Sequence, residues 1–222
     1  MATKILHATR PAAWLLVLAV VAWPTQAQPG GAPANLTTRP AGQGFGVPLT
    51  LQRPEVRAIH AGALRVASPD FLAGGALAAI HSAYADNVSP ALTWQPVRGA
   101  ASYLLVVEDP DSTPGPTVHW VVYDLPASAT GLPRGVPVRP RLADPHGVSQ
   151  GTNTHGTAGY SGPHPPVGDP PHHYHFQVLA LDVLLRLAPG ASRDEVLEAA
   201  RGHVIATGEL VGTYQQLQDP PK

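Results

Sequence analysis

The sequence predicts a mainly β fold: an antiparallel β-sandwich with one or two short helices near the C-terminus. Three continuous apolar runs have the length and β-branched content of buried strands: 102–108, 118–125 and 174–181. The loops between them are dense in Pro and Gly: 110–116, 126–140 and 151–171. Many strands separated by such turn signals are typical of a sandwich or barrel-like domain.

The N-terminal residues have the pattern of an export signal. Lys4 and Arg10 precede an apolar stretch at 11–23, and small residues then lead to Ala27. We expect a signal peptide over residues 1–27, cleaved after Ala27. Because the apolar stretch is shorter than the roughly 20 residues needed to cross a bilayer, an uncleaved anchor is the less favoured alternative. The protein is therefore expected to be exported, to the periplasm or the extracellular space.

The chain contains no cysteine, so the fold must be stabilised by its core without disulfides, and no lipid-modified N-terminus is expected. Residues 28–46 are rich in Pro, Gly, Ala and Thr without apolar periodicity, which predicts a flexible lead-in. Residues 47–222 are long enough to bury one core, and they show neither a repeat nor a second domain.

The overall charge is close to zero. A net charge of −1 and an isoelectric point near 6.8 argue against nucleic acid or an anionic membrane surface as an electrostatic partner. Eleven histidines accompany fourteen Lys and Arg residues, so the charge of the protein should respond to pH between about 5 and 7.

The remaining elements are shorter. Further strands are expected at 47–52, 55–60, 64–68, 91–94 and, closing the fold, 204–214. Ser192 and Glu195 have the spacing of a capping box, in which each side chain satisfies a backbone N–H of the other residue. Apolar residues follow at helical spacing and Gly202 supplies a stop, so a helix is expected between Ser192 and Gly202.

Two acids follow the first buried strand. Asp109 and Asp111 flank Pro110, a pattern that also fits a simple turn in which Asp side chains accept backbone N–H groups. A pair of carboxylates could instead serve in acid–base catalysis, with one pKa raised by the other. Because no nucleophile or activated water accompanies them in the sequence, that reading is weakly supported.

Two histidines stand at strand ends near these acids. His119 precedes Trp120, and His172 precedes Tyr174; each could simply be a packed, hydrogen-bonded side chain. Together with Asp109 they could also form a small pocket for phosphate or carboxylate. The imidazoles would donate to the ligand oxygens, and Asp109 would orient an imidazole or accept from an ammonium group.

The loop at 159–166 is stiff. Gly162 allows a close backbone approach, and Pro163, Pro165 and Pro166 restrict the chain in advance. Rigid backbone with free N–H groups suits an anion site, although a merely stiff surface loop is the alternative.

The histidines at 172, 173 and 175 raise the question of a metal. On a strand His173 and His175 share one face, and His172 shares the other with Tyr174. His155 or His164 could add a ligand, but no recognised ligand spacing occurs, so neither a metal nor another cofactor is expected.

The ordered set of these motifs resembles the phosphatidylethanolamine-binding protein family, and more closely its bacterial Raf kinase inhibitor-like branch. The residues that carry the resemblance are Asp109-Pro110-Asp111, His119-Trp120-Val121-Val122, Gly159-Tyr160-Ser161-Gly162-Pro163 with Pro165-Pro166, His172-His173-Tyr174, Ser89 to Trp94, and Gly208 to Tyr214. The resemblance covers roughly residues 64–214.

The resemblance implies a β-sandwich with a small pocket for phosphate-like or carboxylate anions, including phosphoethanolamine head groups. Carried over by motif, the pocket residues are Asp109, Asp111, His119, Gly162, Pro163, Pro165, Pro166, His172 and Tyr174. Members of the family act by binding lipids, nucleotides, kinases or proteases. Three departures concern the pocket and its rim: His173 stands where many members have Arg or Lys, His164 lies within the proline-rich wall, and residues 76–87 match loosely.

The leading hypothesis is an exported, non-catalytic binding protein for a small phosphate- or carboxylate-bearing ligand, with a phospholipid head group among the candidates. The alternative is inhibition of a protease or kinase as a protein partner, and a metal-dependent hydrolase is the third hypothesis. Nucleic acid is not expected as a partner, and a homodimer stays open.

Overall fold

The computed structural model describes residues 48–59, 62–143 and 147–218, all within one compact unit, Arg39–Lys222. The predicted signal peptide and lead-in therefore lie outside the described residues. A seven-stranded sheet has the order β1-β10-β8-β4-β5-β7-β9, and a three-stranded sheet has the order β2-β3-β6. The strands are β1 (Gly62–Ala63), β2 (Val66–Ala67), β3 (Leu92–Trp94), β4 (Ser102–Asp109), β5 (Thr117–Pro126), β6 (Gly131–Leu132), β7 (Ser149–Thr152), β8 (His172–Leu181), β9 (Gly190–Ser192) and β10 (Val204–Tyr214).

The four long strands confirm the mainly β prediction. β4, β5, β8 and β10 occupy the expected apolar runs, and their contacts in the order β10-β8-β4-β5 are antiparallel. The large sheet is mixed, because β1 pairs parallel to β10 and β9 pairs parallel to β7 near its edges. In each parallel pair the two strands are far apart in the sequence and are connected by a crossover. A crossover allows two strands to run parallel, whereas a short hairpin does not.

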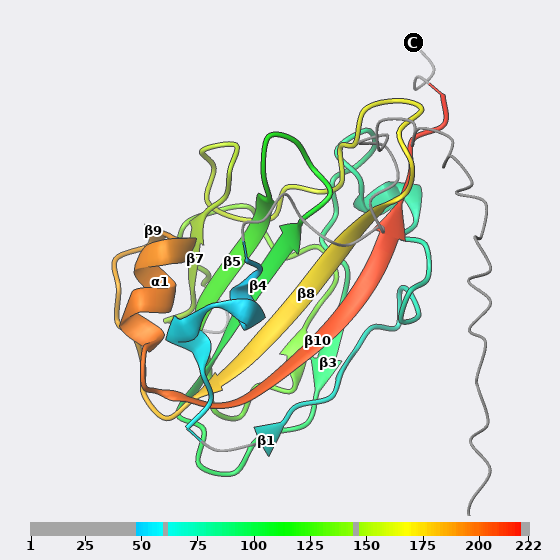
Figure 1. Cartoon of the computed structure of the whole chain (residues 1–222). Helices are drawn as coiled ribbons and strands as arrows, with labels where there is room; N and C mark the ends of the chain where they lie inside the picture. The colour runs from blue at the N-terminus through cyan, green and yellow to red at the C-terminus, as the bar shows by residue number, and fades with distance from the viewer. Residues whose placement is uncertain (1–47, 60–61, 144–146, 219–222) are drawn as a thin grey trace, which may run out of the picture. The chain divides into compact units, whose positions relative to one another are not determined.

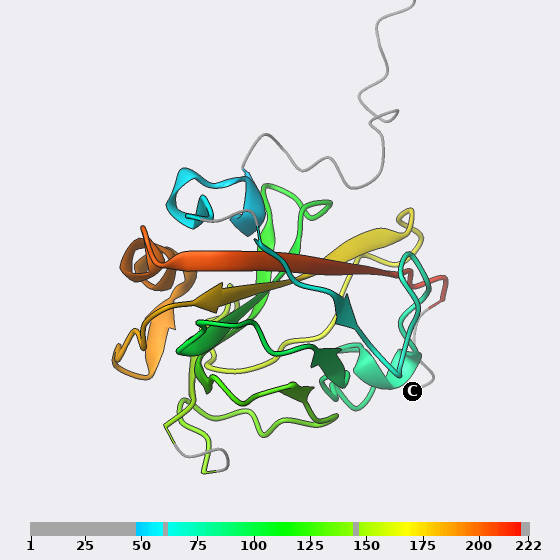
Figure 2. The same ribbon diagram turned by 90° about the horizontal axis from the view of Figure 1, so that it is seen from below.

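The large sheet is buried on both faces, which explains why its strands are continuous apolar runs. One face packs on the three-stranded sheet through residues such as Leu105, Trp120 and Trp94. The other face, which includes Leu104, packs on helix α1 (Arg193–Ala200) through Leu197. Figure 1 shows β8 and β10 side by side, and Figure 2 shows the N-terminal turns, in blue, on one side of these two strands.

Helix α1 has the expected capping box. Glu195 N–H donates to Ser192 Oγ at 3.3 Å, and Ser192 N–H donates to Glu195 Oε2 at 2.7 Å. The helix ends before Gly202, whose φ of +76° lies in the left-handed region that favours glycine. No helix among the described residues is long and apolar enough to cross a membrane.

The N-terminal segment differs from the prediction. Strands were expected at 47–52 and 55–60, but the described part forms two short 3₁₀ turns, η1 (Thr50–Gln52) and η2 (Pro54–Val56). The backbone N–H groups of Thr50 and Leu51 donate to side chains of the large sheet, Glu108 Oε2 at 2.8 Å and Gln177 Oε1 at 2.9 Å. These two N–H groups bond to the side chains of Glu108 and Gln177 and are not available to a neighbouring strand. The segment therefore forms turns over the face of the sheet.

The other short predictions are confirmed in part. The run at 64–68 contains β2, and the run at 91–94 contains β3. Two expected loops each hold a short strand: β6 lies inside 126–140, and β7 overlaps the start of 151–171. A third 3₁₀ turn, η3 (Ala79–His81), packs near the proline-rich loop, where Ala83 N–H donates to Pro163 O at 2.9 Å.

Candidate functional site

A small polar cavity lies where β4 ends and β5 and β8 begin. The antiparallel register places Asp109 opposite Thr117, and Glu108 opposite His175, so the polar residues beyond these pairs meet at one end of the sheet. The cavity has a volume of ≈ 240 Å³. Its lining residues are Asp109, Asp111, Ser112, Thr113, Thr117, His119, His155, His164, Pro165, Pro166, Asp169 and His172.

Asp109 is the centre of the hydrogen bonding at this end. Its Oδ2 atom lies 2.8 Å from His172 Nδ1, and its Oδ1 atom accepts the N–H of Asp111 at 2.8 Å. Asp111 in turn accepts from His173, through Nδ1 at 2.8 Å and through the backbone N–H at 2.9 Å. The turn reading of the two acids is therefore confirmed, and both residues also line the cavity.

The environment of His172 favours its charged form. Burial disfavours the cation, but the carboxylate of Asp109, with Asp111 and Asp169 nearby, outweighs that cost and raises the pKa of His172. When His172 is charged, Nδ1–H donates to Asp109 and Nε2 also carries a hydrogen. Nε2 lies 3.7 Å from Asp169 Oδ2, so it is a donor at the cavity wall.

The environment of His119, in contrast, favours the neutral form of the ring. Its Nδ1 atom lies 2.6 Å from the carbonyl oxygen of Ser161, and the side chain is 3% exposed. Burial lowers the pKa of His119 in spite of the nearby charge of Asp109. Its buried Nε2 atom has no hydrogen-bond partner among the described residues. The neutral ring, with its hydrogen on Nδ1 facing Ser161, has an acceptor at Nε2, whereas the predicted role of His119 was that of a donor.

Tyr174 lies behind the cavity and is not among its lining residues. Its ring meets that of His119 edge-on, with the centroids 5.2 Å apart. Burial, followed by the charge of Asp109, raises the pKa of the Tyr174 hydroxyl far above its usual range. The ring of Tyr174 packs against His119, and its hydroxyl stays protonated at physiological pH.

One part of the proline-rich loop lines the cavity, and the other part packs against a neighbouring segment. Pro165 and Pro166 line the cavity, but Gly162 and Pro163 pack on the segment that follows η3. Gly162 N–H donates to Asn87 Oδ1 at 2.6 Å, and a Cβ at Gly162 would lie 2.1 Å from His81 O. Two N–H groups of this loop, which was expected to offer N–H groups to an anion, are thus occupied: that of Gly162 and that of Ser161, which donates to His119 O at 2.9 Å.

Other lining residues were not in the predicted set. They come from the turn after β4, the start of β5, the loop after β7, the proline-rich loop and the segment before β8: Ser112, Thr113, Thr117, His155, His164 and Asp169. The His164 ring stacks on Tyr84 with centroids 4.1 Å apart. A signal for Asp169 was its place three residues before His172 at the start of β8; for His155 no local pattern existed.

The described residues do not gather into a metal centre. No group of three or more His, Cys, Asp or Glu side chains is placed to hold a metal ion in the described ranges. His173 and His175 lie on the opposite sheet face from His172, as the strand periodicity predicted, and His175 Nδ1 pairs with Glu209 Oε1 at 2.9 Å.

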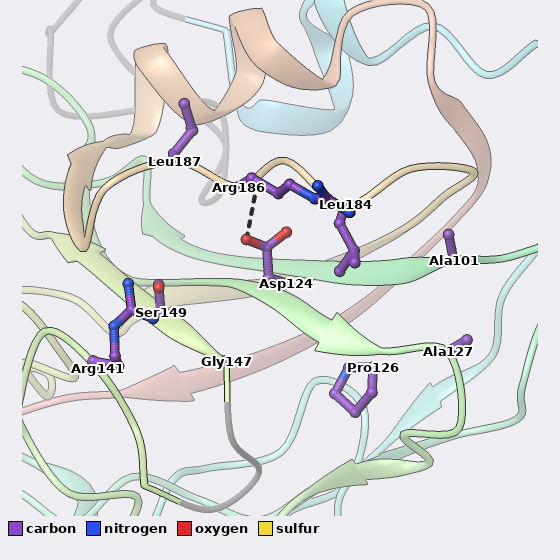
Figure 3. Close-up of a pocket in the computed structure, with 10 residues that line it drawn as sticks. All are labelled: Ala101, Asp124, Pro126, Ala127, Arg141, Gly147, Ser149, Leu184, Arg186 and Leu187. Atoms are coloured by element: carbon purple, nitrogen blue, oxygen red, sulfur yellow. Dashed lines mark hydrogen bonds between the residues drawn. The ribbon is translucent and has the colours of Figure 1, made fainter.

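A larger cavity of ≈ 450 Å³ lies beside β5 and the loop before β9 (Figure 3). Its carboxylate, Asp124, points to the loop backbone and accepts N–H groups of Leu185 at 2.7 Å and Arg186 at 3.0 Å. Asp124 and Arg186 both have positive φ, at 59° and 53°, so this carboxylate holds a tightly turned loop. We take the smaller cavity as the candidate site because Asp109, Asp111, His119, Asp169 and His172 all line it.

The fold and cavity together define a β-sandwich protein with a small polar pocket at one end of its main sheet. The sequence model of the phosphatidylethanolamine-binding protein family matches residues 67–215, and the chain belongs to that family. The resemblance noted from the motifs is thereby confirmed.

Individual proteins with similar sequences can be compared with this chain. A UPF0098 protein of Methanothermobacter thermautotrophicus is 46% identical over 132 residues, which are 59% of this chain and 85% of that protein. A Mycobacterium tuberculosis protein named as a lipoprotein candidate, LppC, is 38% identical over 152 residues, 68% of this chain and 72% of its own.

Two solved structures share the fold. The phosphatidylethanolamine-binding protein homologue CT736 of Chlamydia trachomatis has a TM-score of 0.63 at 36% identity, covering 70% of this chain and 99% of that one. YbcL of E. coli, described as a member of the mammalian PEBP family, has a TM-score of 0.63 at 34% identity, covering 69% and 99%.

Proposed function

We propose that the protein is an exported, non-catalytic binding protein whose cavity at the end of β4 holds a small phosphoryl ligand, such as the phosphoethanolamine head group. The observation that carries the proposal is the pairing of two imidazoles at one cavity: His172 Nδ1 lies 2.8 Å from Asp109 Oδ2, and the buried Nε2 atom of His119 has no partner among the described residues. A buried polar atom without a partner is costly, and a ligand that supplies the missing hydrogen bond removes that cost.

The remaining charges favour a ligand that also carries a cationic group. Asp111 and Asp169 line the same cavity as His172. His172 would face the phosphoryl oxygens, and the two carboxylates would face an ammonium group within the same small ligand. A cavity of ≈ 240 Å³ suits a head group better than a whole lipid.

Export is supported by the charged and apolar pattern of residues 1–27 and by the lipoprotein name of the mycobacterial relative. The non-catalytic assignment is supported by the hydroxyls at the cavity. Ser112 Oγ lies 2.6 Å from Thr117 Oγ1 and 3.0 Å from the carbonyl of Gly115, so neither hydroxyl is paired with an imidazole as a nucleophile requires.

The test is calorimetric titration of the purified protein with O-phosphoethanolamine and with inorganic phosphate at pH 6.5, after chelation. We expect saturable binding that is lost in His172→Gln. His203→Gln is the matched control, because His203 forms a similar pair with Asp182 at 2.9 Å away from the cavity. Absence of heat at millimolar ligand would contradict the proposal and favour docking of a protein partner such as a protease or kinase.

A further inference from the structure

The hydrogen-bonding state of His119 is set by its neighbour. The Nδ1 atom lies 2.6 Å from the carbonyl oxygen of Ser161, and a carbonyl can only accept. Nδ1 must therefore carry the hydrogen. In the neutral ring Nε2 then has a lone pair and no hydrogen, and this buried atom has no partner among the described residues. His119 lines the cavity, so a ligand that reaches this atom meets an acceptor and must supply a donor.

The surroundings of His119 do not readily supply a second proton. The ionisable groups that face it are Asp109 at the end of β4, His155 after β7 and Tyr174 in β8. Asp111, His164, Asp169 and His172 complete the cavity, and none of its described lining residues is Lys or Arg. Burial is the largest influence on His119 and keeps the ring neutral, while the charge of Asp109 acts in the other direction without overcoming it.

We infer that the cavity takes its phosphoryl ligand as the singly protonated monoanion, whose P–OH group donates to Nε2 of His119. His172 donates through Nε2 to an unprotonated phosphoryl oxygen, so one imidazole accepts and the other donates. This assignment rests on the proposed function and adds a selectivity to it. Sulfate has the same shape as phosphate but carries no proton near neutral pH, so it leaves His119 Nε2 facing an anionic oxygen.

In the sulfate complex the lone pair of His119 Nε2 and that of the sulfate oxygen repel each other. The buried Nε2 atom also stays without a hydrogen bond. We therefore expect sulfate to bind at least tenfold more weakly than inorganic phosphate at pH 6.5. Sulfate binding as tight as phosphate would overturn the inference, because a donor at His119 serves both anions equally. If phosphate binds at no pH, the proposed function itself fails, and that result is distinct from equal binding of both.

A pair of phosphonates identifies the source of the proton. Methylphosphonate and difluoromethylphosphonate are similar in shape, but fluorine lowers the second pKa of the latter. The affinity should fall as the pH rises above the second pKa of each ligand, by about tenfold per pH unit for one proton. The pH at which the fall begins should thus be lower for the fluorinated ligand. The same pH for both ligands would show that the complex does not take up the proton of the ligand, and would contradict the inference.

Titration of His172 weakens binding of every ligand at high pH, so only the difference between the two phosphonates is diagnostic.

A variant gives an independent test. In His119→Gln the amide presents either an oxygen or an NH₂ group to the cavity, so the ratio of phosphate to sulfate affinity should fall towards one. An unchanged ratio in a variant with unaltered circular dichroism would assign the selectivity elsewhere. The wild-type ligand series needs no variant and stands if the variant fails to fold.

Discussion

The Nδ1 atom of His172 lies 2.8 Å from Oδ2 of Asp109, and the other oxygen of the same carboxylate accepts the N–H of Asp111 at 2.8 Å. One buried side chain thus joins the end of β4, the turn that follows it and the start of β8. The position and the charge of the cavity's main donor depend on this carboxylate.

Replacing Asp109 by Asn should lower the pKa of His172, because the amide keeps the shape but removes the negative charge that opposes desolvation. We expect at least tenfold weaker binding of O-phosphoethanolamine at pH 7, by calorimetry, and a lower His172 midpoint by NMR titration. Asp182→Asn, which removes the similar partner of His203, is the control and should change neither. An unchanged His172 midpoint in Asp109→Asn would contradict this role.

The ligand-free protein should lose stability through His119 as the pH falls. Because its pKa is lowered in the fold, the unfolded chain takes up a proton near pH 6.5 while the folded protein does not. This contribution to stability is present above the unfolded pKa and is lost as the pH drops towards the folded one. Urea unfolding at pH 7 and pH 5 should show a larger loss for the wild type than for His119→Gln. Equal losses would mean that His119 titrates alike in both states.

The buried Glu108 should depend on Arg193. Glu108 is 0% exposed, and its Oε1 atom accepts from Arg193 Nη1 at 2.5 Å, while Oε2 accepts from Thr50 N–H and Gln177 Nε2. Arg193→Met leaves this carboxylate buried without its cation, which should cost about 3 kcal/mol in urea unfolding.

Adding Glu108→Gln to Arg193→Met should recover part of that loss, because the unpaired charge is removed. Arg201→Met is the surface control: Arg201 pairs with exposed Glu198, and little change is expected. A loss for Arg201→Met equal to that for Arg193→Met would contradict the assignment of burial as the cause.

Gly162→Ala should destabilise the protein, since a Cβ there would lie 2.1 Å from the carbonyl oxygen of His81. The oxygen belongs to the backbone and the position of a Cβ is set by the backbone, so relief requires movement of the proline-rich loop away from residues 81–87. We expect a loss of about 1–3 kcal/mol, as for other overpacked sites, measured by urea unfolding. Gly115→Ala serves as the control, because a Cβ there meets no atom within 4 Å. Equal stability of the two variants would show that the loop yields without cost.

The long strands and helix α1 were predictable because their signals are local. A buried strand is a run of apolar residues, and the Ser192–Glu195 box satisfies the backbone within one turn. The N-terminal turns were not predictable, because Thr50 and Leu51 donate to side chains 58 and 126 residues away. The parallel edge strands β1 and β9 likewise depend on where a crossover brings the chain.

For the site, the sequence by itself determined which polar residues stand at the ends of strands: Asp109, His119 and His172. Only the tertiary structure decided their chemistry. His119 lies 42 residues from the carbonyl that fixes its hydrogen, and His172 lies 63 residues from the carboxylate that favours its charge. Whether an imidazole donates or accepts depends on its burial and on the atom that faces each ring nitrogen, and packing between distant segments sets both.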